Sequence, residues 1–170
     1  MSKVNQKKSP LHVDQSHKKK VKSHGNQTGT WCVQAYVNLT TSHDDRSGSL
    51  LVMPGAHKFH DAFVPTYKRA SDAAKDWYMF SAEERERQLG DIKPVRAHGR
   101  KGSVVLWLSH QPHCAEPPSP AIAADDARER VVVYVCMQPR ALISQRDLAK
   151  KQKYFDEQRM TTHWPASKIS

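Results

Sequence analysis

The triplet His12-Val13-Asp14 near the start of the chain has the residue types and spacing of a metal-binding pair. In an extended chain, residues i and i+2 point to the same side, so a histidine nitrogen and a carboxylate oxygen reach one ion from one strand end. A second histidine would place two histidines and one carboxylate on one face of an octahedron. This arrangement is typical of non-haem Fe(II) oxygenases, because it leaves three positions open for a bidentate oxo-acid and O2.

Several histidines compete for the position of the third ligand. We expect it to be His113, which lies just past a predicted strand that ends near Ser109, and His110 is the alternative. His57 and His60 follow a Pro-Gly turn and are expected to be exposed in a loop, so we do not assign them to the metal. The triplet alone is a weak indication, because chance matches are common in a chain with 10 histidines.

A strand with two different faces is predicted over 31–39, where side chains alternate with a period of two. One face carries Trp31, Val33, Ala35, Val37 and Leu39, and the other carries Cys32, Gln34, Tyr36 and Asn38. The second face is polar but uncharged, whereas a face toward solvent would more often carry lysine and glutamate. It is therefore typical of a barrel interior that holds a polar ligand.

Short apolar runs bounded by turns predict further strands, and capping signals predict helices. Strands are predicted over 49–53, 92–97, 103–109 and 130–137, helices over 72–80, from Ser81 to about Leu89 and from Ser144 to about Gln158, and a proline-rich loop over 114–126. Short strands at regular spacing favour an all-β sandwich or barrel. We expect one domain over 1–170, with a polar tail at 1–10, a core at 11–140 that includes a helical insertion at about 71–90, and a C-terminal helix and tail at 141–170.

The net charge of +10 is gathered in three basic runs, at 18–22, 96–101 and 150–153. A basic surface attracts nucleic acid, anionic lipid or an anionic substrate, and the other interpretation is a solvated face that aids solubility. Aromatic residues do not interleave these runs, which argues against a platform that stacks single-stranded bases.

The three cysteines have no repeated spacing, which argues against a disulfide framework and a zinc ribbon. Apolar runs do not approach the ~20 residues of a membrane span. The first nine residues lack the apolar centre of a signal peptide. We therefore expect a cytoplasmic protein in a reducing compartment, with no membrane span.

Six blocks follow one another from Leu11 to near the C-terminus. They are HVDQS at 12–16, CVQAYVNL at 32–39, GSLLVMPGAHK at 48–58, GSVVLWLS at 102–109 followed by His113, RVVVYVCMQPR at 130–140, and RMTTHWP at 159–165. Together these blocks resemble the phytanoyl-CoA dioxygenase-like group of Fe(II)/2-oxoglutarate-dependent dioxygenases. The similarity is greatest to uncharacterised fungal and large-virus proteins.

The resemblance implies a mainly β fold, a double-stranded β-helix (a jelly-roll or cupin-like barrel), that binds Fe(II) and 2-oxoglutarate. The implied metal ligands are His12, Asp14 and His113, the implied anchor of the distal 2-oxoglutarate carboxylate is Arg130 with Arg128 as the alternative, and the implied cavity residues that position cofactor or substrate are Gln34, Tyr36 and Asn38. Arginine suits the anchor because its fork meets a carboxylate with two hydrogen bonds. The implied reaction converts 2-oxoglutarate and O2 into succinate and CO2 while a small or lipid-like substrate is hydroxylated.

These assignments have structural alternatives. Arg130 begins an apolar strand and could be a surface residue in a strand-edge pair. Gln34 and Asn38 could instead satisfy backbone groups of nearby loops. The pair His163-Trp164 is expected to pack over the mouth of the barrel.

The chain departs from the family pattern in two places. Eleven residues precede His12, so we expect the first of the eight strands of a double-stranded β-helix to have no counterpart, and the chain could be a shortened relative, a truncated gene product or one that borrows this strand from a partner in an oligomer. Leu108-Ser109-His110 stands where the family often has Asp-Ser-Arg, which could alter a bond behind a metal ligand. The alternatives to a dioxygenase of small substrates are a catalytically inactive relative that serves as a structural or binding module, and an oxygenase directed to nucleic acid.

Overall fold

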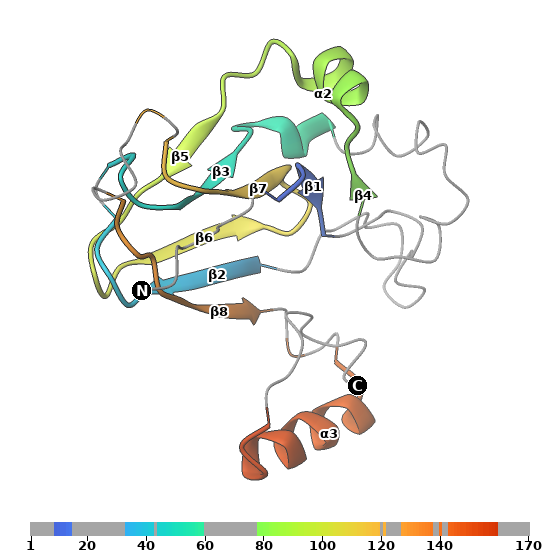
Figure 1. Ribbon diagram of the computed structural model, residues 1–170. Helices are drawn as coiled ribbons and strands as arrows, with labels where there is room; N and C mark the ends of the chain where they lie inside the picture. Colours follow the sequence, from blue (N-terminus) through green and yellow to red (C-terminus); the bar gives the residue numbers. More distant parts are fainter. Residues whose placement is uncertain are drawn as a thin grey trace.

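The fold consists of two antiparallel β-sheets with helices at their periphery (Figure 1). The structure is a computed structural model, and it describes residues 9–14, 33–42, 44–59, 78–119, 121, 127–137, 140 and 143–159. Among these residues the strands form one sheet of five strands and one of three, and no closed barrel is found. The predicted mainly β fold with a helical insertion and a C-terminal helix is confirmed at this level. None of the helices in the described part of the chain is long and apolar enough to cross a membrane.

The five-stranded sheet brings the first described residues beside the middle of the chain. Its order is β4 (Tyr78–Met79), β1 (His12–Val13), β7 (His113–Glu116), β3 (Ser49–Val52) and β5 (Val95–Ala97). His12 and His113 are direct partners across the β1–β7 pair, and Val52 is the partner of His113 on the other side. The pairing of these short strands therefore fixes two of the expected ligands side by side.

Two predictions of local structure on this sheet are wrong. The segment expected to be a proline-rich loop begins with β7, because HCAE gains backbone partners from β1 and β3 although it has little β-propensity of its own. The end of the helix expected over 72–80 is strand β4, because Tyr78 pairs with Val13 and is buried. Residues 72–77 of that expected helix lie outside the described residues.

The three-stranded sheet confirms the other long strands with shorter bounds. Its order is β6 (Val104–Leu108), β2 (Val33–Asn38) and β8 (Val132–Met137). Strand β2 pairs along its whole length with both neighbours, so that Gln34 lies opposite Trp107 and Tyr36 opposite Tyr134. The register places the polar face of β2 and the ring of Trp107 on the same side of the sheet.

The helices agree with their capping signals. Helix α2 (Ala82–Leu89) begins with a complete capping box between Ser81 and Glu84, and helix α3 (Gln145–Asp156) begins at Ser144, whose hydroxyl accepts the Asp147 N–H. A 3-10 turn, η1 (Ala56–Phe59), follows the Pro-Gly turn, where Gly55 takes a positive φ of 79°.

The polar face of β2 points into the protein, as the alternation of its residues predicts. Gln34, Tyr36 and Asn38 are exposed by only 3%, 0% and 1%, whereas Leu39 is 44% exposed. Tyr36 and Trp107 pack with Leu50 of the five-stranded sheet, so this face forms the layer between the sheets. A second apolar cluster joins β1, β3 and β7 to Leu89 of α2. Trp31 and Cys32 of the predicted strand lie outside the described residues.

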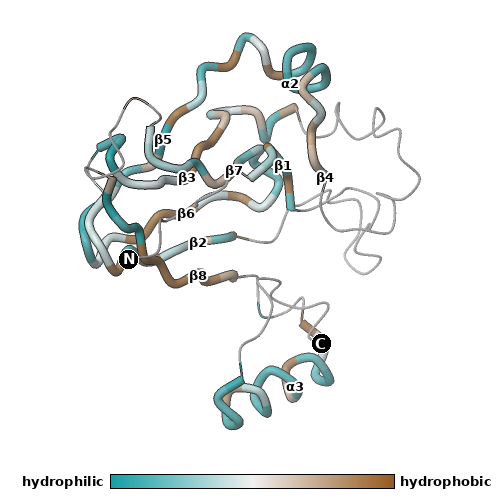
Figure 2. Tube along the Cα trace, viewed as in Figure 1, coloured by the Kyte–Doolittle hydropathy of each residue, from teal (hydrophilic) through white to brown (hydrophobic). Residues whose placement is uncertain are grey.

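The opposite face of the three-stranded sheet is apolar and partly exposed. Its exposed residues are Val104, Leu106, Val133, Val135 and Met137. Figure 2 shows hydrophobic colour along β8 at this side of the molecule. Sequence alternation therefore identifies correctly which face of β2 is inward, even though the inward face is the more polar one.

Candidate metal centre

The three expected ligands come together at one point between the sheets. His12 and Asp14 lie at and just after β1, His113 opens β7, and one ligand atom from each residue lies within 4.8 Å of the others. The Asp14 oxygens are 3.6 Å from His12 Nε2 and 3.3 Å from His113 Nε2. The two imidazole rings have centroids 4.5 Å apart. The pairing of His12 with His113, together with the i, i+2 spacing of His12 and Asp14, accounts for this convergence.

Each imidazole is oriented by a backbone carbonyl two residues earlier. His12 Nδ1 lies 2.8 Å from the carbonyl oxygen of Pro10, and His113 Nδ1 lies 2.7 Å from that of Gln111. A carbonyl oxygen only accepts, so Nδ1 carries the proton and donates it in both rings. Nε2 faces Asp14 in both rings, where it donates to the carboxylate when it carries a proton and offers its lone pair to a metal when it does not. Metal-binding histidines are commonly held by this kind of hydrogen bond.

Asp14 is an ionised carboxylate in a buried position. It is 8% exposed, and Gln34 Nε2 donates to its Oδ2 at 2.7 Å. Burial raises the pKa of Asp14, but the hydrogen bond and charge of His113, the charge of His12 and the bond from Gln34 outweigh burial and lower the pKa to about 2. Asp14 is therefore in the state that a divalent cation requires of a ligand.

A stack of rings leads from the ligands toward Arg130. The ring of Trp107 lies 5.4 Å from that of His113 and 5.8 Å from that of Tyr36. The Arg130 guanidinium lies 4.4 Å above the Tyr36 ring on the same inner layer. Arg130 Nε and Nη2 are buried and have no hydrogen-bond partner among the described residues. Buried guanidinium donors without partners fit an anionic ligand that is bound by two hydrogen bonds.

A cavity of about 480 Å³ opens beside Arg130 between β7 and the start of β8. Its lining includes Arg130, Val132, Tyr134, Glu116 and Glu129, and the three candidate metal ligands do not contribute to it. Arg128 is exposed, and its backbone N–H donates to the carbonyl of Arg46. Of the two expected anchors, the geometry therefore favours Arg130.

The three expected cavity residues of β2 make different contacts. Gln34 contacts Asp14, and Tyr36 supports Arg130 and donates its hydroxyl to the Ala97 carbonyl at 3.2 Å. Asn38 lies four residues beyond Gln34 and donates to Ser103 Oγ at 3.0 Å, at the turn between β5 and β6. Asn38 thus stabilises a turn, while Gln34 and Tyr36 contact groups of the candidate site.

His110 and His57 lie outside the group of three candidate ligands. His110 is buried but does not belong to the metal-binding group of the described residues, so the geometry favours His113 over it. The expectation that His57 is exposed is wrong, because it is half-buried, packs against the ring of His110 and hydrogen-bonds Gln111 Oε1 at 2.8 Å. Sequence reasoning missed Gln111, and its only signal is its place two residues before His113. His60 and the pair His163-Trp164 lie outside the described residues.

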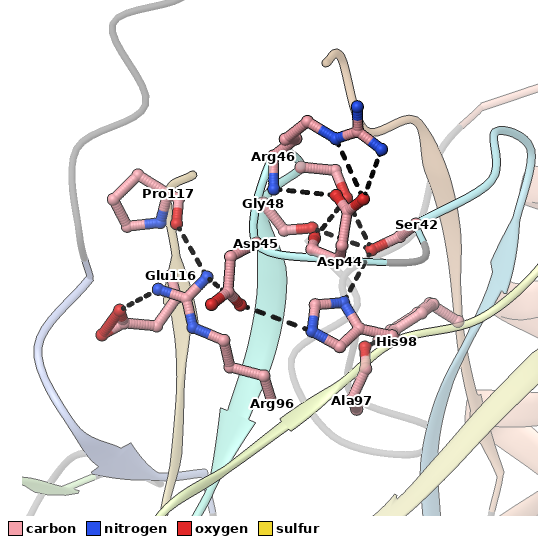
Figure 3. Close-up of polar contacts among 12 residues, drawn as sticks. Ser42, Asp44, Asp45, Arg46, Gly48, Arg96, Ala97, His98, Glu116 and Pro117 are labelled. Carbon is pink, nitrogen blue, oxygen red and sulfur yellow. Dashed lines mark hydrogen bonds and ion pairs between the residues drawn. The ribbon is translucent and has the colours of Figure 1, made fainter. Parts of the chain in front are cut away.

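A second polar cluster lies around the loop before β3 (Figure 3). His98 Nδ1 is 3.3 Å from Ser42 Oγ, and His98 Nε2 is 3.6 Å from Asp45 Oδ1, which is the order of residue types found in serine hydrolases. Ser42, however, is 1% exposed, accepts a hydrogen bond from Ser47 and lies within bonding distance of the Gly48 carbonyl. A nucleophile must reach its substrate, so this cluster stabilises the loop.

Comparison with known proteins adds no relative. The chain matches no protein-family model, and a search of curated proteins finds none that matches it. The resemblance to the phytanoyl-CoA dioxygenase-like group therefore stays a prediction from the residues.

Proposed function

We propose that this protein is a non-haem Fe(II)- and 2-oxoglutarate-dependent dioxygenase that hydroxylates a small or lipid-like substrate. One observation carries the proposal: two histidines and a buried carboxylate with their ligand atoms already converged, on the same inner layer as an arginine whose Nε and Nη2 are buried and have no hydrogen-bond partner among the described residues. Two imidazole nitrogens and one carboxylate oxygen suit Fe(II) with open positions. Buried guanidinium donors of this kind suit the far carboxylate of an oxo-acid.

The contacts of each residue suggest its role in the proposed function. His12, Asp14 and His113 would hold the metal, which when bound supplies the chemistry of O2 activation and 2-oxoglutarate decarboxylation. Arg130 would bind the distal carboxylate of 2-oxoglutarate, and the Tyr36 ring beneath it keeps the guanidinium in place. Trp107, which is 8% exposed and lies between His113 and Tyr36, would exclude water from the path between metal and anchor.

The finer fold that we propose is a double-stranded β-helix. Two facing antiparallel sheets support it, with the candidate ligands on the inner layer between them. In the described part of the chain β8 ends the three-stranded sheet, and a fourth strand at that edge would give this sheet the four strands of one half of a double-stranded β-helix. A partner copy in an oligomer is one source of that strand.

The second candidate is a catalytically inactive relative that binds a ligand. The observation in its favour is that the cavity beside Arg130 does not include the three metal ligands among its lining. Such a protein would bind an oxo-acid or a related anion through Arg130 without turning it over.

The test is to purify the protein without oxygen, add Fe(II) and 2-oxoglutarate, admit O2 and measure succinate. We expect succinate from the wild type and none from His12→Ala or Asp14→Ala. His98→Ala is the matched control, because it removes a histidine that also faces an aspartate but lies in the loop cluster. Metal binding without succinate would support the inactive relative, and absence of metal binding by the wild type would rule out the dioxygenase.

A further inference from the structure

Gln34 is buried in a way that folding stability alone does not explain. Its side chain donates to Asp14 Oδ2 at 2.7 Å, yet its own Oε1 is buried with no hydrogen-bond partner among the described residues. A buried acceptor without a partner is unfavourable, and an apolar side chain of similar length would avoid it. Apolar residues already fill neighbouring positions of the same layer, such as Leu50 and Trp107.

The orientation of the Gln34 amide follows from the charge of its partner. An ionised carboxylate only accepts hydrogen bonds, so the amide must turn its NH2 group toward Asp14 and its oxygen away. Residues 14 and 34 are 20 apart in the sequence, and β2 lies in the other sheet from β1. The hydrogen bond therefore connects Asp14, next to β1 of one sheet, to Gln34 of β2 in the other sheet.

The bond leaves the two oxygens of Asp14 in different surroundings. Oδ2 accepts from Gln34 at 2.7 Å and lies 3.3 Å from His113 Nε2, while Oδ1 lies 3.6 Å from His12 Nε2 and has no contact with Gln34 that the structure records. When one carboxylate oxygen accepts a strong hydrogen bond, the other oxygen is the better metal ligand. The hydrogen bond also restricts rotation of the carboxylate group. Hydrogen-bond partners behind a ligand commonly set metal affinity in this way.

We propose that Gln34 is a positioning residue that fixes Asp14 as a one-oxygen ligand through Oδ1, and so keeps coordination positions open for the bidentate oxo-acid. This inference rests on the proposed function. In this role Gln34 acts on the candidate ligand Asp14, whereas the resemblance implied a contact of Gln34 with cofactor or substrate.

The experiment measures Co(II) binding, without oxygen, by the full chain and its Gln34→Met variant. Methionine keeps the length of the side chain and removes the donor. We expect the Co(II) affinity to fall roughly 10- to 100-fold. We also expect the visible absorption bands of bound Co(II) to change, because a freed carboxylate can bind through both oxygens. Thermal unfolding of the metal-free variant should occur near the wild-type temperature, because the loss of the hydrogen bond to Asp14 and the removal of the unpaired Oε1 act in opposite directions.

The matched control is Asn38→Leu, which removes another buried amide from the same face of β2. Its donor serves Ser103 and not a ligand, so Co(II) affinity and absorption bands should equal those of the wild type. Wild-type affinity and bands in Gln34→Met would overturn the inference while leaving the dioxygenase proposal intact. A fall in affinity that only accompanies a loss of metal-free stability would also overturn it. If the wild type itself binds no Co(II), the proposed function fails first.

Discussion

A buried carboxylate and a partly exposed one have a similarly lowered pKa for different reasons. Asp14 and Asp44 both have a pKa lowered to about 2. Asp44 achieves this locally and near solvent, because the side chain and backbone N–H of Arg46, two residues later, donate to it at 2.6–3.0 Å. Asp14 achieves it although it is buried, with partners from β1, β7 and β2.

The difference lies in what the partners can do next. Arg46 is a permanent cation that satisfies Asp44 and has no lone pair to offer a metal. The histidines around Asp14 are held by carbonyls at Nδ1 and turn Nε2 toward the carboxylate, so a cation can take the place of their mutual contacts. The same lowered pKa therefore belongs to a complete ion pair at Asp44 and to a group at Asp14 that could hold a metal ion.

The largest expected contrast is in metal affinity. Asp14→Asn keeps the shape of the side chain and removes the charge, so we expect Fe(II) or Co(II) affinity to fall by more than roughly 100-fold, since loss of a ligand exceeds the loss of a group behind one. Asp44→Asn should leave the affinity unchanged. Anaerobic titration calorimetry measures the affinity of both variants, and an equal loss of affinity in the two would show that Asp14 and Asp44 do not differ in this respect.

The next contrast is between the arginines. Arg46 already has its carboxylate, whereas the Nε and Nη2 atoms of Arg130 have no hydrogen-bond partner among the described residues. We expect Arg130→Leu to raise the KM for 2-oxoglutarate roughly 10- to 100-fold, because hydrogen bonds to a charged group are lost. Arg46→Leu and Arg128→Leu should leave it unchanged. Succinate formed at a series of 2-oxoglutarate concentrations gives the values, and an increase confined to Arg128→Leu would move the anchor to that residue.

The stability of the protein toward acid should depend on Asp14. The folded pKa of Asp14 is about 2 and its ordinary value is 3.8, so its stabilising effect is complete above pH 3.8 and is lost as the pH falls through 2. For this buried group the effect is about 2 kcal/mol in the metal-free protein. Urea unfolding between pH 2 and pH 6 should therefore show a shallower pH dependence in Asp14→Asn. The same slope in that variant as in the wild type would contradict the assignment.

The smallest expected effect concerns the loop cluster of Figure 3. Ser42→Ala removes the hydroxyl between Ser47 and His98, so we expect a loss of about 1 kcal/mol of unfolding free energy. Succinate formation should be unchanged, because the cluster stabilises a loop. Loss of turnover without loss of stability would instead point to a catalytic role of Ser42.

The candidate metal ligands could be predicted from the sequence, whereas several of the strands and contacts around them could not. The i, i+2 spacing of His12 and Asp14 and the inward polar face of β2 are local patterns, and both are found in the structure as predicted. The strand state of β7 depends on neighbours far along the chain, and its four residues carry no pattern of their own. This is why the loop predicted there is wrong.

Contacts between sheets are the other part that local patterns do not determine. The bond from Gln34 to Asp14 depends on how β2 faces β1, and the position of Arg130 over Tyr36 depends on the start of β8 beside β2. Periodicity predicts that Gln34, Tyr36 and Asn38 point inward. It does not predict that Asn38 stabilises a turn while Gln34 contacts a candidate ligand.

The carbonyls that hold His12 and His113 also determine how many protons must leave when a metal arrives. The Nδ1 protons stay on their hydrogen bonds to Pro10 and Gln111, so proton exchange on metal binding is confined to the two Nε2 atoms that face Asp14. Asp14, with a pKa of about 2, is already ionised. Metal uptake would then release only the protons that Nε2 shares with Asp14, at most one per ring, and titrations in buffers of different ionisation heat would count them.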